Sequence, residues 1–358
     1  MAAIAQAAST RPIRVLIVDD SPLVRKMLKS GLGQAEGLTV VGTACDPFEA
    51  RDMIVKLRPD VMTLDIEMPR MNGLEFLRRL MPKFAIPTVV VSSLSQKGSR
   101  IAIDALAAGA VDVVGKPTGE AGYRFAQMMA ELQIRVRNAA RVNRGLLRCR
   151  VPAPISRALR PTYVEAATER VISIGASTGG TEALFQILQG MPVDTPPMVV
   201  VQHMPPGFTK ALAERLNAQV ALSVVEAVHG DRLVRGRVLL APAGKQCQVV
   251  RVSNHYQLAI STAAAVEGHC PSVDVLFGSM AKEVGGAGIG VILTGMGRDG
   301  ANGLKQMRDA GARTIGQNEA TSVVYGMPKV AFELGGVEQQ VPLERVADAI
   351  KVTLRATK

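Results

Sequence analysis

Three polar residues in the C-terminal half of the chain could act together as a nucleophile, a base and an acid. Ser177 lies in VISIGASTGG, His203 in VVVQHMPPGF and Asp299 in GVILTGMGRDG. Each follows a run of β-branched apolar residues and lies beside a glycine-rich or proline-rich turn, where open α/β sheets hold their functional groups. The set predicts a triad in which the serine attacks a carbonyl carbon, the histidine takes its proton and the aspartate orients the imidazole.

The serine lies in a G-x-S-x-G segment formed by Gly175, Ser177 and Gly179. Small residues at these positions let a strand turn sharply into a helix and leave the serine exposed. A glycine-rich loop before a helix can also bind phosphate, but GASTGGTEA has neither the GK[ST] of a P-loop nor the GxGxxG of a dinucleotide site. The segment therefore favours a nucleophile, although the motif is weak by itself.

The other two assignments depend on position. The four histidines all lie in this half of the chain: His203, His229, His255 and His269. Only His203 ends an apolar strand pattern against a turn, and a structural histidine is the alternative. Asp231 and Asp274 compete with Asp299, which is favoured because its flanking glycines permit close approach of the backbone. The alternative for Asp299 is to cap a helix that begins near Asn302.

Three carboxylates in the N-terminal half form a second candidate site. Asp19 and Asp20 follow the strand pattern VLIV, and Asp65 follows VMTL. Three carboxylates at neighbouring strand ends need a cation, and Mg²⁺ prefers such oxygen ligands. The alternative is that Asp19 and Asp20 cap the helix that starts at SPLVRKML.

The elements around these residues alternate between strand and helix patterns in both halves. Near-continuous Val, Ile and Leu in the strands is typical of parallel sheets covered on both faces. We predict an α/β protein in three parts. They are an N-terminal doubly wound domain with five parallel strands over 12–118, a helix and basic linker over 119–168, and a C-terminal α/β parallel-sheet hydrolase domain over 169–356.

Charge and composition limit the classes of function. The net charge of +11 is concentrated in residues 118–170, which carry 10 basic and 4 acidic side chains. Such a segment is a solvated tether or a docking strip for an acidic partner. The cysteines, Cys45, Cys149, Cys247 and Cys270, show no CxxC spacing, and the sequence shows no signal peptide and no apolar run of about 20 residues. We expect a cytoplasmic protein.

The N-terminal domain resembles the receiver domain of two-component response regulators. The resemblance is carried, in order, by the DD pair, DIEMPRMNG, VVSS and GKP. It implies that Asp65 accepts a phosphoryl group and that Mg²⁺ is held by Asp19, Asp20, Asp65 and the main-chain carbonyl of Glu67.

Two further receiver residues would read the modification. The resemblance implies that Lys116 neutralises phosphate charge and that the Ser92 hydroxyl moves toward the new phosphoryl oxygens. Many receivers carry an aromatic residue three positions before this lysine, but here the position is Val113. An aromatic switch is therefore not expected in its usual form.

The C-terminal domain resembles the catalytic domain of the chemotaxis protein-glutamate methylesterases, the CheB family. The matching segments are GASTGG, QHMPPGFTKALAERL, PSVDVLF, ILTGMGRDG and TSVVYGMPKVA. The chain order Ser, His, Asp differs from that of α/β-hydrolases and fits a separate lineage. APAGKQ stands where the family more often has APGG, and QNE where it has QDE; neither change touches the triad.

This resemblance implies hydrolysis of γ-glutamyl methyl esters on the cytoplasmic helices of chemoreceptors, with release of methanol and often deamidation of selected glutamines. The implied partners are methylated receptor helices and a histidine kinase of the CheA type as phosphodonor; the esterase reaction needs no cofactor. The main-chain amides of Thr178 and Met296 are candidate oxyanion donors.

We expect the N-terminal domain to control the C-terminal one by docking over the Ser177 site until Asp65 is phosphorylated. Two alternative functions remain. A DNA-binding response regulator would explain the basic linker, but no helix-turn-helix pattern follows it. A non-catalytic protein that binds the receptor or the kinase would not need all three triad residues.

Overall fold

A computed structural model describes residues 11–117, 121–147 and 170–356 of the chain. The chain folds into two compact units. The first unit contains residues 1–93 and 108–149, and the second contains 94–107 and 150–358. Much of the predicted basic linker, at 148–169, lies outside the described residues, so its conformation stays a prediction.

The first unit is built on five parallel strands in the order β2-β1-β3-β4-β5. Strands β3 and β4 are buried along their whole length, as expected for a sheet covered on both faces. The predicted five-stranded parallel sheet is confirmed. The strands are β1 (Ile13–Val18), β2 (Leu38–Ala44), β3 (Val61–Asp65), β4 (Thr88–Ser92) and β5 (Asp112–Gly115).

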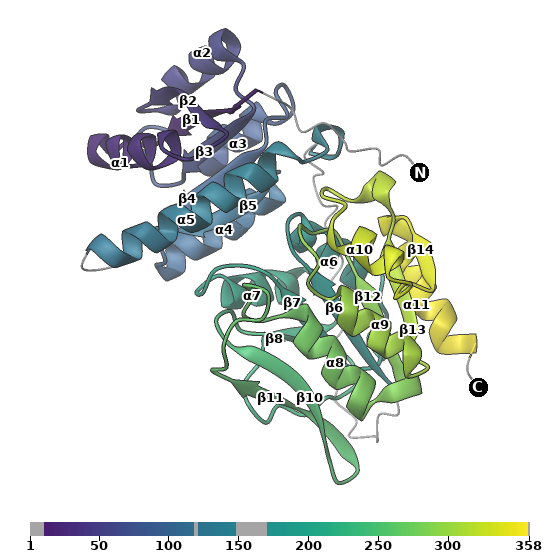
Figure 1. Cartoon of the computed structure of the whole chain (residues 1–358). Coiled ribbons are helices and arrows are strands. Elements are labelled where there is room, and N and C mark those ends of the chain that lie inside the picture. The colour runs from purple at the N-terminus through teal and green to yellow at the C-terminus, as the bar shows by residue number, and fades with distance from the viewer. Residues whose placement is uncertain (1–10, 118–120, 148–169, 357–358) are drawn as a thin grey trace. The chain divides into compact units, whose positions relative to one another are not determined.

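The helices of the first unit form two pairs on opposite faces of this sheet (Figure 1). Helix α1 contacts α5, and α2 contacts α3. Ser21 caps α1 by accepting a hydrogen bond from the amide of Val24, so neither Asp19 nor Asp20 is the capping residue. The helices are α1 (Pro22–Gly33), α2 (Pro47–Leu57), α3 (Gly73–Leu80) and α5 (Ala121–Ala140), with a 3₁₀ turn at Arg144–Leu146.

The second unit contains a parallel sheet in the order β14-β13-β12-β6-β7-β9-β8. The α/β class predicted for the C-terminal half is therefore confirmed. The strands are β6 (Val171–Ala176), β7 (Met198–Gln202), β8 (Ser223–Glu226), β9 (Arg237–Leu240), β12 (Gly288–Ile292), β13 (Arg313–Gln317) and β14 (Gln339–Val341).

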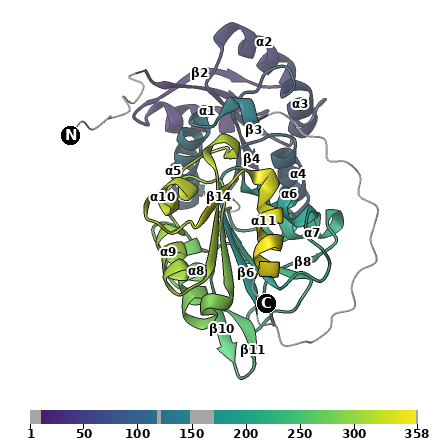
Figure 2. The same ribbon diagram turned by 90° about the vertical axis from the view of Figure 1, so that its right-hand side faces the viewer.

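Helices and one hairpin cover the second sheet (Figure 2). Helices α6 and α11 contact each other, as do α8 and α9, and the antiparallel hairpin β10–β11 packs against α8. The elements are α4 (Gln96–Ala107), α6 (Gly180–Gln189), α7 (Thr209–Gln219), β10 (Gln246–Val252), β11 (His255–Ser261), α8 (Val273–Glu283), α9 (Ala301–Asp309), α10 (Met327–Glu333) and α11 (Leu343–Ala356), with 3₁₀ turns at Gly285–Ala287 and Glu319–Thr321.

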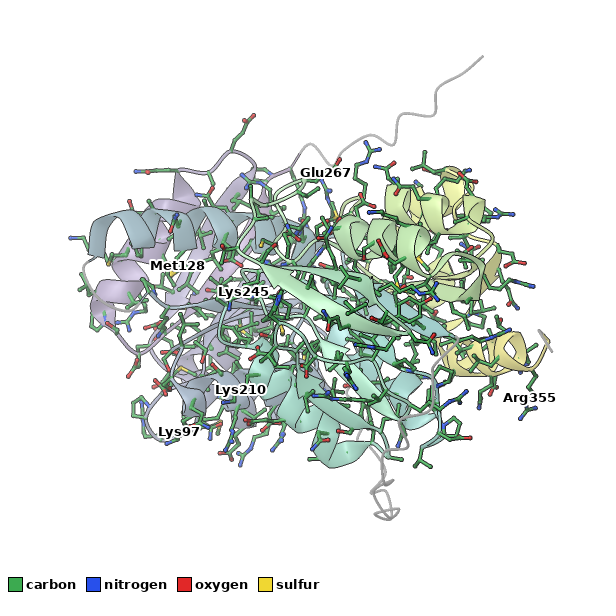
Figure 3. All side chains as sticks on the ribbon, turned by 90° about the horizontal axis from the view of Figure 1, so that it is seen from below. Lys97, Met128, Lys210, Lys245, Glu267 and Arg355 are labelled. Carbon is green, nitrogen blue, oxygen red and sulfur yellow. The ribbon has the colours of Figure 1, made fainter. Side chains whose placement is uncertain are left out.

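The core of this unit fixes the position of α8. Side chains fill the space between the helices and the sheet (Figure 3). The buried apolar cluster includes Phe277 and Met280 of α8 and Leu304 and Met307 of α9. Phe277 and Leu304 have no exposed surface. Burial of apolar area on this scale stabilises the packing of both helices by several kcal/mol, at about 25 cal/mol per Å².

Strand order changes direction at β6. The strands that follow it in sequence, β7, β8 and β9, lie on one side of β6, and β12, β13 and β14 lie on the other. Ligands of open α/β sheets bind outside the carboxyl ends of the strands at such a switch point. The loops after β6, β7 and β12 are therefore where chemistry is expected.

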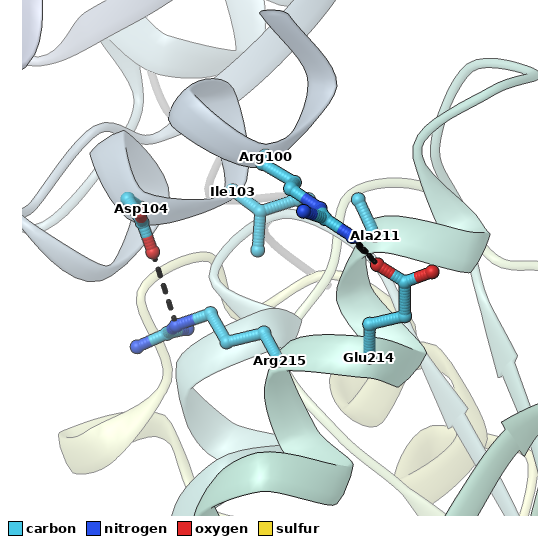
Figure 4. Close-up of a pocket in the computed structure, with 6 residues that line it drawn as sticks. All are labelled: Arg100, Ile103, Asp104, Ala211, Glu214 and Arg215. Carbon is cyan, nitrogen blue, oxygen red and sulfur yellow. Dashed lines mark hydrogen bonds and ion pairs between the residues drawn. The ribbon is translucent and has the colours of Figure 1, made fainter. Parts of the chain in front are cut away.

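Helix α4 packs on α7 within the second unit (Figure 4). Arg100 Nη2 lies 2.9 Å from Glu214 Oε2, and Arg215 Nε lies 3.7 Å from Asp104 Oδ1. The two pairs flank a pocket that also has Ile103 and Ala211 in its lining. Each helix thus contributes one base and one acid to the contact.

Within the described ranges, no helix combines the length and the apolar character needed to cross a membrane.

Candidate active site

Ser177 lies at the sharp turn between β6 and α6. Its amide donates to the Thr294 carbonyl at 3.0 Å, which ties the turn to the end of β12. Gly179 precedes α6 with a φ of 79° and would bring a Cβ to 2.7 Å from Val323 Cβ, so only glycine fits there. The predicted sharp turn is present, but the serine is not exposed as the motif predicted, because the neighbouring turns cover it and leave 6% of its surface accessible.

His203 is the neighbour of Ser177 across the sheet. Ala176 at the end of β6 is paired with Gln202 at the end of β7, so the next residue on each strand is Ser177 or His203. The His203 amide donates to the Ala176 carbonyl at 3.0 Å. Strand register therefore brings the predicted nucleophile and base to the same edge.

Gln202 fastens these two loops together. Its Nε2 donates to the Ser177 carbonyl at 2.8 Å and to the His203 carbonyl at 3.1 Å. The side chain is almost fully buried. This residue was missed at the level of sequence; its signal was a polar residue that ends an all-apolar buried strand.

The carboxylate of Asp299 contacts the imidazole ring of His203. Its Oδ2 lies 2.8 Å from His203 Nε2. A carboxylate only accepts hydrogen bonds, so Nε2 carries the proton and Nδ1 has the free lone pair. Nδ1 is buried and has no hydrogen-bond partner within the described part of the chain. In the usual triad Nδ1 faces the acid, so this ring has its two nitrogens exchanged.

Asp299 is itself fixed by the start of α8. Its carboxylate accepts hydrogen bonds from the Ser272 hydroxyl at 2.7 Å and from the amides of Val273 and Asp274 at 2.7 and 3.0 Å. Helix N-termini offer unsatisfied amides and a favourable dipole for an anion. Ser272 lies in the family segment PSVDVLF, but its contact with Asp299 was not predicted from the sequence.

These donors decide the charge of Asp299. Burial raises the pKa of its carboxyl group, but the hydrogen bond and charge of His203, the Asp274 amide and the Ser272 hydroxyl lower it to about 2. The group is therefore ionised at neutral pH. An ionised acid in this position stabilises a protonated imidazole.

The competing assignments have other partners. Asp231 is paired with Arg237 at 3.0 Å, and Asp274 accepts from the Gly303 amide at 2.7 Å. Helix α9 begins at Ala301 with Gly300 as its capping residue and no side-chain cap, so Asp299 does not cap it. His229 bonds to the Ile260 main chain, and His255 starts β11.

The two predicted oxyanion donors lie in tight turns beside the serine. Thr178 immediately follows Ser177, and its carbonyl accepts from Thr294 Oγ1 at 3.0 Å. Met296 follows Gly295, where an added Cβ would lie 2.7 Å from Ser177 Cβ. The turns thus approach the serine closely, and the oxyanion role of the two amides stays a prediction.

The predicted metal site in the first unit has the required carboxylates close together. Oxygen atoms of Asp19, Asp20 and Asp65 lie within 4.8 Å of one another. Lys116 Nζ lies 2.7 Å from Asp65 Oδ2 and 3.1 Å from Asp19 Oδ2. Burial raises the pKa of Asp65, and the charge of Asp19 adds to this, although Lys116 acts in the opposite direction.

The residues around the carboxylates suit a hard cation. Asp19 Oδ2 is buried and accepts no hydrogen bond in the described part of the chain, despite its ion pair with Lys116. The Glu67 amide lies 3.3 Å from Asp65 Oδ1. Ser92 ends β4 and is fully buried, and its carbonyl accepts from the Lys116 amide at 2.7 Å. An oxygen-only set with one unsatisfied carboxylate oxygen fits Mg²⁺.

Comparison with known proteins bears on both units. The family model described as CheB methylesterase matches residues 172–350, and the model described as response regulator receiver domain matches 15–124. A protein-glutamate methylesterase/protein-glutamine glutaminase of Syntrophotalea carbinolica is 52% identical over 343 residues, which cover 95% of this chain and 97% of the relative. The chain belongs to the CheB methylesterase family. Both resemblances drawn from the sequence are confirmed.

Other CheB relatives agree along the chain. The protein of the same name from Salmonella typhimurium is 45% identical over 351 residues, covering 96% of this chain and 97% of its own. The crystal structure of the Thermotoga maritima CheB methylesterase catalytic domain has a TM-score of 0.51 and 34% identity, and covers 51% of this chain and 98% of that one. The CheB assignment thus rests on both sequence and fold.

Proposed function

We propose that this protein is a phosphorylation-regulated protein-glutamate methylesterase that also deamidates glutamines, with Ser177, His203 and Asp299 as its triad. The observation that carries the proposal is the His203–Asp299 hydrogen bond at the switch point, next to a serine elbow. Relatives of similar length bear both activities in their names. The substrates would be glutamyl methyl esters and glutamines of chemoreceptor helices, in the cytoplasm.

The first half of the reaction follows from the arrangement of the ring nitrogens. The Ser177 Oγ attacks the ester carbonyl carbon while His203 Nδ1 takes the hydroxyl proton. The tetrahedral intermediate collapses, the bond to the methoxy group breaks, and Nδ1 returns the proton to that oxygen. Methanol leaves, and the glutamyl group remains esterified to Ser177.

Water completes the cycle. It attacks the acyl carbon as His203 Nδ1 takes one of its protons, and the proton then passes to Ser177 Oγ as the acyl bond breaks. A glutamine side chain follows the same course with ammonia as the leaving group. Asp299 stays ionised throughout and stabilises the imidazolium at Nε2.

The oxyanion of each intermediate needs donors that point at it. We assign this role to the main-chain amides of Thr178 and Met296, in the two turns that approach the serine. Loss of one such donor typically costs about 10²-fold or more in rate. Because both donors are main-chain groups, substitutions of the side chains leave them in place.

The receiver domain, which we place at 12–118 before the linker at 119–168 and the catalytic domain at 169–356, would be phosphorylated at Asp65. Asp19, Asp20, Asp65 and the Glu67 carbonyl would hold Mg²⁺. The ion supplies positive charge that lowers repulsion between the carboxylate and the incoming phosphoryl group. Lys116 and Ser92 would then bind the phosphoryl oxygens, and a CheA-type histidine kinase would supply the group.

Helix α4 is suited to carry the signal. It lies within the residues that match the receiver family, directly after the strand that ends at Ser92, and it packs on α7 in the second unit. We assign to it the coupling between Asp65 and the esterase. Deletion of residues 1–117 should raise the basal esterase rate, and an unchanged rate would exclude inhibition by the N-terminal half.

Methanol release from methylated receptor membranes tests the activity. Wild type and Ser177→Ala are each assayed with and without a small phosphodonor and Mg²⁺. We expect release by wild type only, increased by the phosphodonor, and no increase in Asp65→Asn. Wild type that folds, binds receptor and releases no methanol under any condition would instead support a non-catalytic binding protein.

A further inference from the structure

A second histidine lies flat against the ring of the proposed base. The ring centroids of His203 and His269 are 3.9 Å apart, and the two planes are inclined by 2°. His203 is buried, whereas His269 is half-buried at the surface side of the pair. His269 therefore covers a face of the His203 imidazole.

The loop that carries His269 is tightly held. Gln246 Nε2 donates to the carbonyls of Ala264 and His269, both at 3.1 Å, and Gln246 Oε1 accepts from the Ser272 amide at 2.9 Å. Val266 and His269 exchange two main-chain hydrogen bonds of 3.0 and 2.9 Å. One buried glutamine thus joins the His269 loop to the serine that binds Asp299.

Two further contacts fix the same loop. The Gly244 amide donates to the Cys270 carbonyl at 2.9 Å. Glu267, labelled in Figure 3, forms a 3.9 Å ion pair with Arg298, the residue before Asp299. The loop is therefore anchored on both sides of His269.

The His203 ring needs such a contact. Its only side-chain hydrogen bond in the described part of the chain runs from Nε2 to Asp299, and one hydrogen bond leaves a ring free to tilt about that contact. Tilting would move Nδ1, the atom that must receive the serine proton. A flat neighbour at van der Waals distance blocks this tilt and keeps water from that face of the ring.

Building on the proposed function, we propose that His269 is a positioning residue for the general base: it limits the tilt of the His203 ring and so keeps Nδ1 where it can take the Ser177 proton during the reaction. Its contribution is the flat ring face; its nitrogens take no part in proton transfer. An electron-rich ring face also favours the imidazolium that forms during each step. Misplacement of a catalytic group by about 1 Å can cost about 10²-fold in rate.

Three variants of the full-length chain test this. His269→Ala removes the ring, His269→Phe keeps a flat ring without nitrogens, and His255→Ala is a control on β11. Methanol release from receptor membranes, with the phosphodonor present, gives kcat and KM. We expect about 10- to 100-fold lower kcat for His269→Ala with KM nearly unchanged, and near wild-type kcat for His269→Phe and His255→Ala.

A second readout does not depend on the substrate. The Nε2 proton of His203, hydrogen bonded to Asp299, should give a low-field proton NMR signal in wild type and in His269→Phe that weakens in His269→Ala as water reaches the ring. If His269→Ala does not fold, His269→Gln replaces it. Wild-type kcat in the ring-less variant, or equal losses in the alanine and phenylalanine variants, would overturn the proposal.

The same assays also test the proposed function separately. A wild-type protein without esterase activity would refute that function, whereas the NMR comparison would still decide whether His269 orders the His203 ring. Loss of the signal in both variants would count against the flat-ring role.

Discussion

At the residue scale, the histidine that we propose as the base has one hydrogen bond to its ring and a second ring stacked on its face. Nε2 is fixed by Asp299, and the ring face is covered by His269, while Nδ1 keeps a free lone pair. Asp299 comes from the turn after β12, and Ser177 comes from the turn after β6, the neighbouring strand. The acid thus contacts Nε2 and leaves Nδ1 for the serine, whereas in the usual triad the acid contacts Nδ1.

Asp299 should make the stability of the catalytic unit sensitive to acid. Its pKa is lowered to about 2 in the folded chain, from 3.8. A lowered carboxyl pKa stabilises the fold above its ordinary value, and this stabilisation is lost as the pH falls from about 4 toward 2. The difference corresponds to about 2 kcal/mol. Between about pH 2 and 4, we expect the unfolding free energy of wild type to rise more steeply than that of Asp299→Asn.

Calorimetry of both proteins from about pH 2 to 6 checks this, since that range spans the titration of the group in both states. Because other carboxyl groups titrate in the same range, the quantity of interest is the difference between the two curves. A difference that does not vary with pH would contradict the lowered pKa.

Gln202 should matter more for turnover than its distance from the reacting atoms suggests. Gln202→Met removes the donor to the Ser177 and His203 carbonyls, and leaves both without that partner. Loss of buried partners costs about 1–3 kcal/mol each. We expect a lower Tm and a kcat reduced by at least 10-fold, because the two loops would no longer be tied.

Gln202→Glu sharpens the comparison, since it keeps the shape but places a carboxylate beside two carbonyl oxygens. It should fall below Gln202→Met in both stability and rate. A kcat within about twofold of wild type in either variant would show that strand register alone fixes the loops.

At the element scale, α8 connects the core to the acid of the triad. Its buried face packs through Phe277 and Met280, and its first amides bind Asp299. The helix start cannot move without moving the carboxylate. Helix α8 thereby supports the residue that we propose as the acid of the triad.

Ser272→Ala tests this support. The hydroxyl both caps α8, through the Val275 amide, and donates to Asp299. Loss of a cap costs about 1 kcal/mol, and the lost donor should raise the pKa of Asp299 from about 2. We expect a lower Tm and a 10-fold or greater fall in kcat, measured by calorimetry and methanol release.

Ser279→Ala is the matched control. Ser279 is on the same helix and its hydroxyl bonds the Leu276 carbonyl and the Val249 amide, without touching the triad. It should lower Tm by a similar amount and leave kcat near wild type. Equal losses of kcat in the two variants would mean that general destabilisation explains the effect.

The elements also show what the sequence could and could not predict. Strand-ending residues such as Ser177 and His203 were found because parallel strands leave runs of Val and Ile that end at a definite residue. The contacts of Ser272, Gln202 and His269 with the predicted triad were not predicted, because they join segments far apart in sequence. The spacing of apolar residues does not indicate that a glutamine will donate to two carbonyl groups, or that a loop will place one histidine ring on another.

Strand order was likewise beyond the sequence. Strand β9 lies between β7 and the edge strand β8, although it follows β8 in the chain, and this position depends on contacts between distant segments. The short β14 and the helices α8, α10 and α11 were not predicted, although the alternating α/β class was. The functional edge of the sheet was still predictable, because carboxyl ends of parallel strands lie together whatever their order.

At the scale of the whole molecule, α4 is assigned differently by sequence and by packing. By sequence it follows a receiver strand, and by packing it lies with the catalytic unit on α7. Two ion pairs, Arg100–Glu214 and Asp104–Arg215, join it to α7 (Figure 4). Arg100 and Glu214 are both exposed, and an exposed pair contributes only about 0.2–1 kcal/mol, so this part of the contact can be released by a modest signal.

Charge reversal tests whether this contact restrains the esterase. Arg100→Glu places two carboxylates together and should raise the basal rate of methanol release by about 2- to 5-fold, as should Glu214→Arg. The double variant restores an opposite pair and should return to the wild-type rate. Lys97→Glu makes the same change of charge on α4, at a residue with no ion pair among the described residues, and should have no effect.

The phosphodonor separates this restraint from a direct effect on catalysis. Suppose that α4 inhibits the esterase until Asp65 is phosphorylated. Each single reversal should then raise the rate measured without phosphodonor and leave the rate measured with phosphodonor unchanged, because the inhibitory contact is already broken. A reversal that raises both rates by the same factor would act on the catalytic site itself. Single variants that are additive in the double, with no restoration, would show that the two side chains do not interact in solution and that the signal passes through another surface.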